Sequence, residues 1–554
     1  MHYELRLFDF FNEHVRKETS VDELAQIWHC STRYAKTIVK KMQQLNIIKW
    51  EVTKGRGKKP FITLLQSKED CIIRLFISYW EKNQFEEAYS LIGKYQMLQN
   101  SIIQNWLQQQ YGIQQNEQLQ HILRLPFFNQ NLTVNPLQAL SNWDAHLIKQ
   151  IHEPLFKENE ATGEIEANLL FDYETHDYKK WRLILRKDAY FHHLKPVCAE
   201  DIQFSLERLA QLAKPYFDYE QFEIVHALEL TLTLSKPFAL LPELLSSFRT
   251  VILPKDTPDG TIGCGPFMLE KSSPYLVKLT TFNRYFNKRP YLDGIEFIFD
   301  NNDTEFGISY SPYAHDIPQK ELLMQQFSTD YVVLNMQNGP LQNDKMRETV
   351  YALIQPEDFI KNIRTETIST NWLPIHKQHL SATIHCIGND FPTLSIGYQY
   401  LSSDVNYLDK ALILQSKLNQ FGIKTELECI DLYKDKSVDS SIDIFIGGAT
   451  FGKQSILSIL NIYFTQPKAI LSFLDEYQRK RLIQSLEKIY TTKLQSLDEA
   501  TLNELVEQTQ KIYCLKMLTH RQQRMYVRED FIYKNVKFDS NGFIQYNKIY
   551  FNGK

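Results

Sequence analysis

Features that mark secreted, membrane-spanning and disulfide-bonded proteins are missing from this sequence. The seven cysteines are odd in number, widely scattered and never arranged as a CxxC pair. This usage fits a reducing compartment better than a disulfide framework or a zinc site. No run of about 18 uncharged apolar residues occurs, which argues against a membrane span. Because charges are spread through residues 1–18, we expect no secretory signal peptide and a cytoplasmic location.

Signatures of catalysis are missing as well. The sequence has no GxSxG, HExxH or dinucleotide-binding pattern, and no cysteine and histidine arranged as nucleophile and base. His176, His192 and His193 could suggest a metal site, but adjacent side chains on a strand point to opposite faces. We therefore expect no enzyme activity, no metal and no cofactor.

Basic charge is concentrated near the start of the chain. The whole sequence carries a net charge of -4, whereas residues 1–65 hold 12 basic and 7 acidic side chains, so the other 489 residues carry -9. Between residues 31 and 65, nine cations face one acid, Glu51. This segregation indicates a nucleic-acid-binding end, although a basic run can also be an ordinary solvated surface.

Helical signals in this basic segment follow the order of a helix-turn-helix. Leu7, Phe8, Phe11 and Val15 form an apolar stripe that predicts a first helix. A capping box of Ser20 and Glu23 begins a second helix, which ends near Trp28. Ser31 caps a third helix, whose buried stripe is Ala35, Ile38, Val39, Met42 and Leu45 and whose outer face holds Thr32, Arg33, Lys36, Thr37, Lys40 and Lys41. A third helix with a basic, hydroxyl-rich face is typical of one that enters the major groove.

A hairpin follows the third helix. Alternating apolar residues predict strands on both sides of the turn at residues 54–60, and the turn carries two glycines and four cations. This arrangement predicts a wing whose cations meet phosphates; it lacks the glycine spacing of a phosphate-binding loop. The predicted DNA-binding residues are Ser31, Thr32, Arg33, Lys36, Thr37, Lys40, Arg56, Lys58 and Lys59. A protein-binding winged helix, or a small helical domain with a charged exterior, is the alternative.

The length of the chain requires more than one domain. A sequence of 554 residues, 43% hydrophobic and 13% aromatic, exceeds the usual size of a single domain. We divide it into a winged helix-turn-helix (1–65), a helical linker (66–117) and a large domain (118–554). Residues 107–120 are glutamine-rich and read as a linker or frayed helix, and the whole linker could couple the two ends, support a dimer or act as a spacer.

Strands and helices alternate in the large domain. Residues 122–127 and 181–186 read as strands, and residues 143–156 and 201–212 read as helices. Such alternation is typical of an α/β domain.

Ordered motifs between about residues 121 and 550 resemble the extracellular solute-binding proteins of the oligopeptide and dipeptide transport type. They are Asn135-Pro136-Leu137, Glu153-Pro154-Leu155-Phe156, Trp181 to Lys187 with Phe191-His192, Ala199-Glu200-Asp201-Ile202 leading to Ser205-Leu206-Glu207-Arg208-Leu209, Gly263-Cys264-Gly265-Pro266-Phe267, Asn283-Arg284-Tyr285-Phe286 with Arg289-Pro290-Tyr291-Leu292-Asp293, Asn335-Met336-Gln337, and Leu418 with Phe421-Gly422-Ile423-Lys424. The resemblance implies a two-lobed α/β domain, of the type II periplasmic-binding-protein kind, that closes on a small solute.

A solute-binding domain behind a winged helix resembles the SgrR family of bacterial transcriptional regulators. Both the wing Gly55-Arg56-Gly57-Lys58 and the entry His121-Ile122-Leu123-Arg124 match that family. The resemblance implies a cytoplasmic regulator that binds promoter DNA and senses a sugar, sugar phosphate, peptide or metal complex. It is compatible with a homodimer and does not decide the oligomeric state. The rival interpretations are an extracellular solute-binding protein that serves an ABC transporter, and a scaffold that binds protein.

One segment departs from the peptide-binding pattern. Peptide-binding relatives carry an acidic segment after a buried strand, and its aspartate anchors the amino group of the peptide. Here the strand 443–448 is followed by Ala449-Thr450-Phe451-Gly452-Lys453-Gln454, which disfavours a peptide. Lys453 could face an anion or be an ordinary exposed lysine. Trp372, Phe451 and Lys453 are the candidates for lining the solute cleft.

Overall fold

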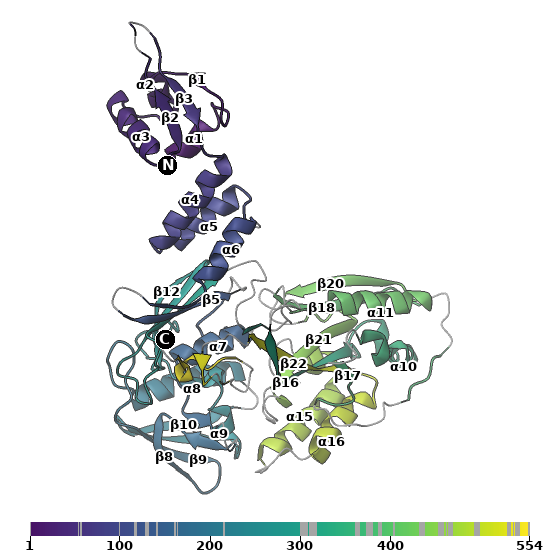
Figure 1. Ribbon diagram of the computed structural model, residues 1–554. Helices are drawn as coiled ribbons and strands as arrows, with labels where there is room; N and C mark the ends of the chain where they lie inside the picture. Colours follow the sequence, from purple (N-terminus) through teal and green to yellow (C-terminus); the bar gives the residue numbers. More distant parts are fainter. Residues whose placement is uncertain are drawn as a thin grey trace.

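The structure of the protein is a computed structural model of the 554-residue chain. It describes residues 2–551 except Lys54, Arg56, Gly57, Gln99, 116–118, 128–131, 140–141, 160–161, Gly163, 214–216, 300–307, 310–317, 361–365, 373–380, 386–390, 403–404, 432–437, 452–458, Asn461, 464–468, 492–498, 529–532, Val536 and 538–542. We call residues 2–65 the head, 66–111 the neck, 112–299 with 533–551 lobe 1, and 308–528 lobe 2. Figure 1 shows the head above the neck, the neck above lobe 1, and lobe 2 beside lobe 1.

The head is a winged helix. Its elements are α1 (Tyr3–Leu7), β1 (Lys17–Glu18), α2 (Val21–Ile27), α3 (Thr32–Gln44), β2 (Ile48–Glu51) and β3 (Phe61–Leu64), with the strands in the order β1-β3-β2. The predicted capping box begins α2, because Ser20 Oγ accepts from the Glu23 amide at 3.2 Å and Glu23 Oε2 accepts from the Ser20 amide at 3.0 Å. Ala35, Ile38, Val39 and Met42 are buried, as the stripe predicted, whereas Leu45 is exposed.

The first helix is shorter than its apolar stripe indicated. α1 ends at Leu7, and Val15 is exposed. The following segment instead reaches β1, in which Lys17 pairs with Ile62 of β3. Strand pairing with a distant segment outcompetes local helical spacing here, because it satisfies backbone groups at the edge of the sheet.

The neck is a helical unit with an aromatic core. It contains α4 (Lys68–Glu81), α5 (Phe85–Lys94) and α6 (Ser101–Gln110). Trp80 lies edge-on to Phe85 with ring centroids 4.8 Å apart, and to Trp106 at 5.6 Å. Of the glutamine-rich residues 107–120, expected as a linker or frayed helix, residues 107–110 end α6 and residues 112–115 form β4, which pairs with β5 of lobe 1.

Lobe 1 is built on a sheet in the order β12-β13-β14-β5-β4. Its elements are β4 (Gly112–Gln115), β5 (His121–Phe127), α7 (Asn142–Ile151), β6 (Phe156–Glu158), β7 (Ile165–Ala167), β8 (Leu170–Thr175), β9 (Lys180–Leu185), α8 (Ala199–Ala213), β10 (Tyr219–His226), β11 (Glu229–Leu234), α9 (Leu241–Leu244), η1 (Phe248–Thr250), β12 (Phe267–Ser273), β13 (Leu276–Thr281) and β14 (Gly294–Phe299). The helix expected to reach residue 156 ends at Ile151, since Pro154 disfavours a continuing helix. The C-terminal elements β23 (Tyr533–Lys534), η4 (Tyr546–Lys548) and β24 (Tyr550–Phe551) return to lobe 1, where Tyr546 packs on Phe297.

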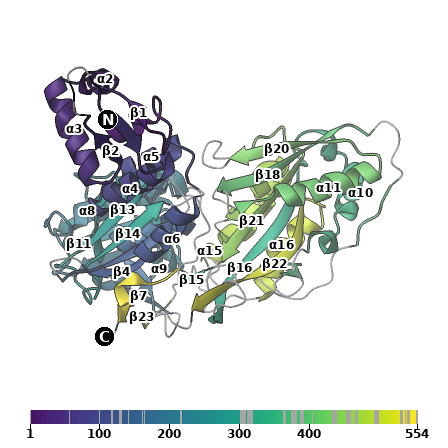
Figure 2. The same ribbon diagram turned by 45° about the horizontal axis from the view of Figure 1, so that its top comes forward.

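Lobe 2 contains a mixed sheet in the order β15-β22-β16-β21-β18-β19, with β17 on β22 and β20 on β18. Its elements are β15 (Ile308–Ser309), β16 (Gln319–Leu334), η2 (Pro340–Gln342), α10 (Asp344–Leu353), η3 (Pro356–Phe359), β17 (Glu366–Ile368), β18 (Leu394–Ser402), β19 (Val405–Asn406), α11 (Leu408–Gln420), β20 (Thr425–Asp431), β21 (Ile444–Phe451), α14 (Ala469–Phe473), α15 (Glu476–Thr491), α16 (Glu499–Gln510) and β22 (Leu515–Arg528). The long strands β16 and β22 extend from beside lobe 1 into lobe 2 (Figures 1 and 2). None of the helices in the described residues is long and apolar enough to cross a bilayer.

Three of the sequence motifs meet at one buried point in lobe 1. The Glu153 carboxylate accepts from the Tyr285 hydroxyl at 2.5 Å and from the Asn168 amide at 2.8 Å. Gly263 and Gly265 lie against the Ile151 and His152 backbone so closely that a Cβ at either position would overlap it. Burial, and then the neighbouring Glu153 carboxylate, raise the pKa of Tyr285. The three motifs therefore have a structural role, because they pack against one another in the interior of lobe 1.

We predict that Tyr285→Phe lowers the free energy of unfolding by about 1.5–3 kcal/mol, because it removes a donor to a buried carboxylate. Urea denaturation of the full-length chain measures the change. Tyr477→Phe, at an exposed position, is the matched control and should have little effect. Equal stability of the two variants would contradict the role assigned to Glu153 and Tyr285.

Candidate nucleic-acid interface

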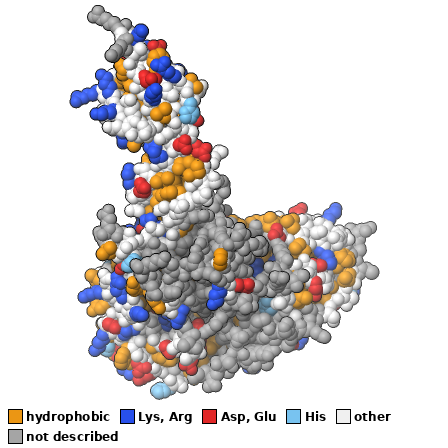
Figure 3. All heavy atoms as spheres, viewed as in Figure 1, with side chains coloured by type: hydrophobic (Ala, Val, Ile, Leu, Met, Phe, Trp, Pro, Cys, Tyr) orange, Lys and Arg blue, Asp and Glu red, His pale blue; other side chains and the backbone are white. Residues whose placement is uncertain are grey.

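The exposed face of α3 carries most of the predicted DNA-binding residues. Ser31 caps the helix by accepting from the Tyr34 amide at 3.3 Å. Arg33, Lys36, Thr37 and Lys40 are exposed on the side of α3 opposite its buried stripe. Figure 3 shows Lys and Arg side chains protruding from the side of the head on which α3 lies. A helix with this exposed basic face has the shape and charge that a DNA groove accepts.

Thr32 has an internal role at the start of α3. Its hydroxyl donates to Asp22 Oδ1 of α2 at 2.8 Å. This bond joins the first turns of α2 and α3. Thr32 therefore helps to hold α3, and with it the basic face, against α2.

An ion pair holds the base of the wing against α2. Lys58 and Lys59 are exposed, and Arg56 lies outside the described residues. Lys59 Nζ donates to Glu23 Oε1 at 2.5 Å, while Glu23 Oε2 accepts from the Thr19 hydroxyl at 2.8 Å. The capping carboxylate of α2 thus also anchors the base of the wing.

Glu23 is strongly biased toward its charged form. Hydrogen bonds from Lys59 and Thr19, and one from the Ser20 amide, lower the pKa of Glu23 from 4.5 to about 2. A carboxylate with a lowered pKa stabilises the fold above its ordinary pKa, and this contribution is lost as the pH falls toward 2. The contact should therefore persist at every pH at which DNA is studied.

Acids from outside and inside the basic segment neutralise several of its cations. Glu23 takes Lys59, and Glu51 pairs with both Lys49 at 3.1 Å and Arg16 at 3.0 Å. Glu23 lies outside residues 31–65, so a count of charges in that segment does not reveal its ion pair with Lys59. The capping box was visible in the sequence, but its second partner was not.

Of the three predicted cleft side chains, the structure describes that of Trp372. Trp372 is fully buried, and its indole nitrogen donates to the Tyr463 hydroxyl at 2.9 Å. Its ring also lies edge-on to Tyr331, with centroids 5.3 Å apart, so it is a core residue of lobe 2 with no open face for a solute. Phe451 ends β21 and its side chain is not described, while Lys453 lies outside the described residues.

The end of β21 is lined by hydroxyls. The side chains of Ser328 and Thr450 lie 3.3 Å apart on the paired strands β16 and β21. Further along the same ladder into lobe 2, Gly448 leaves room for the Tyr407 hydroxyl, which donates to buried Asp330 at 3.0 Å. Lys410 Nζ pairs with the same carboxylate at 2.6 Å. The Asp330 charge is thus already neutralised inside the lobe.

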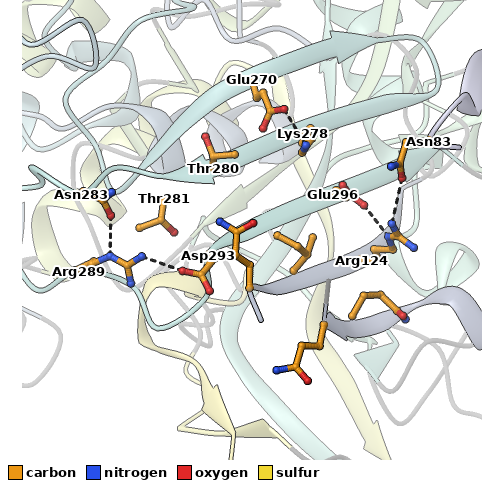
Figure 4. Close-up of a pocket in the computed structure, with 14 residues that line it drawn as sticks. Asn83, Arg124, Glu270, Lys278, Thr280, Thr281, Asn283, Arg289, Asp293 and Glu296 are labelled. Carbon is orange, nitrogen blue, oxygen red and sulfur yellow. Dashed lines mark hydrogen bonds and ion pairs between the residues drawn. The ribbon is translucent and has the colours of Figure 1, made fainter. Parts of the chain in front are cut away.

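A polar pocket, unexpected from the sequence, lies where the neck meets lobe 1 (Figure 4). Its volume is about 550 Å³. Its charges pair with one another: Arg124 with Glu296 at 2.7 Å, Lys278 with Glu270 at 2.8 Å, and Arg289 with Asp293 at 2.9 Å. Arg124 also approaches Asn83 of the neck at 3.5 Å. The pocket belongs to the junction between the neck and lobe 1.

Comparisons with known proteins match both halves of the chain. Residues 1–115 match the model for the sugar transport-related sRNA regulator N-terminal domain, SgrR_N, and residues 136–383 match the middle of family 5 of the bacterial extracellular solute-binding proteins. The chain therefore carries an SgrR_N domain followed by a family 5 solute-binding domain and resembles the SgrR-like proteins in both. The families it matches are of solute-binding proteins and regulators, not enzymes.

Curated relatives match half of the chain or more. The YhjP protein of Bacillus subtilis is 27% identical over 491 residues, 84% of each chain. The HTH-type transcriptional regulator SgrR of Yersinia enterocolitica is 25% identical over 450 residues, 78% of this chain and 79% of that one. SgrR of Salmonella typhi is 28% identical over 293 residues, and that match spans half of each chain.

Solved structures identify the fold of the two lobes. A dipeptide-binding protein from Pseudoalteromonas sp. SM9913, in complex with Met-Leu, aligns with a TM-score of 0.62 at 15% identity over 77% of this SgrR-like chain and all of the other. DppA from Helicobacter pylori, in complex with the peptide STSA, gives 0.62 at 17% identity over 78% and 98% of the two chains. The predicted fold class, a winged helix followed by a two-lobed type II solute-binding fold, is confirmed.

We predict that Arg33→Ala with Lys36→Ala weakens specific DNA binding by roughly 1 to 3 kcal/mol for each side chain that hydrogen-bonds a base edge. Both residues lie near the start of α3, on its exposed face. Gel retardation of the full-length variant measures the change in affinity. Lys82→Ala, at an exposed position in the neck, is the control. Unchanged operator affinity in a folded double variant would exclude α3 as the recognition helix.

We predict different salt effects for two neighbouring wing lysines. Lys58→Ala should reduce the slope of log K against log salt by about 0.9, since each neutralised phosphate releases condensed counterions. Lys59→Ala should leave the slope unchanged and lower affinity only by loosening the wing, because Glu23 holds this ammonium. Titrations on duplex DNA at several salt concentrations test this. Equal slope changes would show that Lys59 leaves Glu23 for a phosphate.

Proposed function

We propose that this SgrR-like protein is a cytoplasmic transcriptional regulator that binds promoter DNA through its head and senses a small solute through its two lobes. The observation that carries the proposal is the exposed basic face of α3, presented by a winged helix joined to a solute-binding fold. The names of the SgrR relatives support it, since they are HTH-type transcriptional regulators.

DNA recognition in this proposal uses Arg33, Lys36, Thr37 and Lys40 on α3, with Ser31 and Thr32 at its start. Lys58 and Arg56 reach phosphates beside the groove, and Lys59 holds the wing in place. Phosphate contacts set the register and orientation of the head, and the base-facing side chains of α3 supply specificity. The functional division follows residues 1–65 for DNA, 66–117 for connection and 118–554 for sensing.

The solute in this proposal has no free amino terminus. Structural relatives are named for complexes with a dipeptide or a tetrapeptide. In this chain the segment after β21 lacks the anchoring aspartate, and the buried Asp330 is already paired with Lys410. Ser328 and Thr450 offer neutral hydroxyls near the end of β21, which suit an uncharged polar or sugar-like group.

Mapping the genomic sites bound by the full-length protein tests the regulator hypothesis. We expect discrete sites near promoters, and retention of those fragments in gels that weakens steeply with salt. The correct solute should raise the melting temperature, because it binds the folded protein. It should also change operator affinity, because a solute that alters DNA binding must bind the DNA-competent and DNA-incompetent conformations with different affinities. Recovery of the chain at the cell surface, without any bound DNA, would favour the transport-associated alternative.

A further inference from the structure

The outer face of the lobe 1 sheet is built to receive the neck. Along β13 and β14, alternate residues point to opposite faces of the sheet. Val277, Leu279, Ile295 and Phe297 belong to the inner core with α7. Leu276 and Ile298, which pair across the two strands, instead belong to the same buried cluster as the head and neck.

An aromatic stack joins α5 of the neck to the lobe 1 sheet. The rings of Tyr89 in α5 and Tyr275, at the turn between β12 and β13, are parallel within 3° with centroids 5.5 Å apart. Beside them, Lys271 Nζ lies 3.7 Å from Glu86 of the neck. Apolar burial and stacking thus act on the same small area, and such pairs add to the energy of burial alone.

The backbone crosses the same junction as a strand. β4 follows α6 directly and pairs with β5, so that Gly112 lies opposite Arg124. Backbone hydrogen bonds therefore hold the chain against β5 as soon as it leaves α6. A flexible linker at this place would have let the neck rotate freely on lobe 1. The side chain of the same Arg124 contacts both Asn83 of the neck and Glu296 of β14, and all three residues line the pocket between the neck and lobe 1 (Figure 4).

The head is fixed to the neck in turn. Buried residues of both form one cluster that includes Trp28 and Phe76. The amide of Lys68 donates to Glu13 Oε1 at 2.9 Å, and Arg74 pairs with Glu4 at 3.5 Å. Only residues 65–67 lie between the end of β3 and the start of α4.

The connection between the lobes is of another kind. The ladder between β16 and β22 is irregular between Leu323 and Phe327, and such irregularities bend a strand. The lobes are in contact through a shared apolar cluster and through an exposed pair between Lys236 and Glu487 at 3.0 Å. Exposed pairs contribute little to stability, so motion between the lobes is opposed mainly by the apolar cluster.

We infer that the head, the neck and lobe 1 move as one rigid body, so that any motion between the lobes displaces lobe 2 relative to the DNA-binding face. The orientation of α3 on lobe 1 then stays constant. Under the proposed function, solute binding would act on transcription through the position of lobe 2, which would approach or leave the flanking DNA or a second copy of the chain.

Distances between spin labels in the full-length protein test this inference. Labels carried on an unnatural keto amino acid at Phe10 of the head, Phe171 of lobe 1 and Leu412 of lobe 2 use exposed positions and leave the cysteines unchanged. Glu487→Lys places two cations against each other and should separate the lobes. We expect it to shift the Phe171 to Leu412 and Phe10 to Leu412 distances, and to leave a single narrow Phe10 to Phe171 distribution.

A second pair of variants tests the junction itself. Tyr89→Ala with Tyr275→Ala should broaden the head to lobe 1 distribution, because the strand ladder and the apolar pair then hold the junction without the stack. Tyr291→Ala, which removes an exposed lobe 1 tyrosine stacked on His121, should preserve the narrow distribution. A head to lobe 1 distance that shifts with Glu487→Lys, or a head to lobe 1 distribution that is broad in the unsubstituted protein, would overturn the inference. Neither measurement requires DNA, so failure of DNA binding would be recognised separately.

Discussion

The docking of the neck on the lobe 1 sheet is the contact that joins the two halves of this protein. Leu276 and Ile298 would be exposed on the outer face of the sheet without it, and burying two such side chains contributes roughly 1.5–3 kcal/mol each. Pairing of β4 with β5 also sets the orientation of the neck on lobe 1, because a strand ladder has one register and one direction. The position of α3 relative to the solute-binding lobes follows from these contacts.

Charge has two separate uses in the head. On α3 the basic side chains are exposed on a helix whose other face is buried, which leaves them available to a polyanion. At the base of the wing, Lys59 and the capping residue Glu23 neutralise each other and join the wing to α2. Under the proposed function, the same residue type therefore serves recognition on α3 and positioning at the wing, and the neighbouring carboxylate distinguishes the two uses.

Lobe 2 combines the fold of the solute-binding proteins with a charged pair in its interior. The buried pair of Asp330 and Lys410 lies among the strands that continue toward lobe 1. Removing one partner of a buried pair leaves an uncompensated charge, so the two residues depend on each other. Gly448 is required beside them because a side chain there would overlap Tyr407 and Asp330. This constraint accounts for a glycine in a strand that is otherwise mostly apolar.

Local and patterned features of this protein were determined by the sequence alone. The capping box at Ser20 and Glu23, the buried stripe of α3 and the ordered motifs of the solute-binding domain were sufficient to predict the winged helix, its exposed basic face and the two-lobed fold, since each depends on neighbouring residues or on motif order. The tertiary structure decided what depends on distant partners. It ended α1 at Leu7, formed β1 against β3, placed residues 112–115 in β4, buried Trp372 against Tyr463 and paired Lys59 with Glu23. Strand pairing, side-chain burial and ion pairing between residues far apart in the chain are set by packing, and hydrophobic periodicity and charge counts do not contain that information.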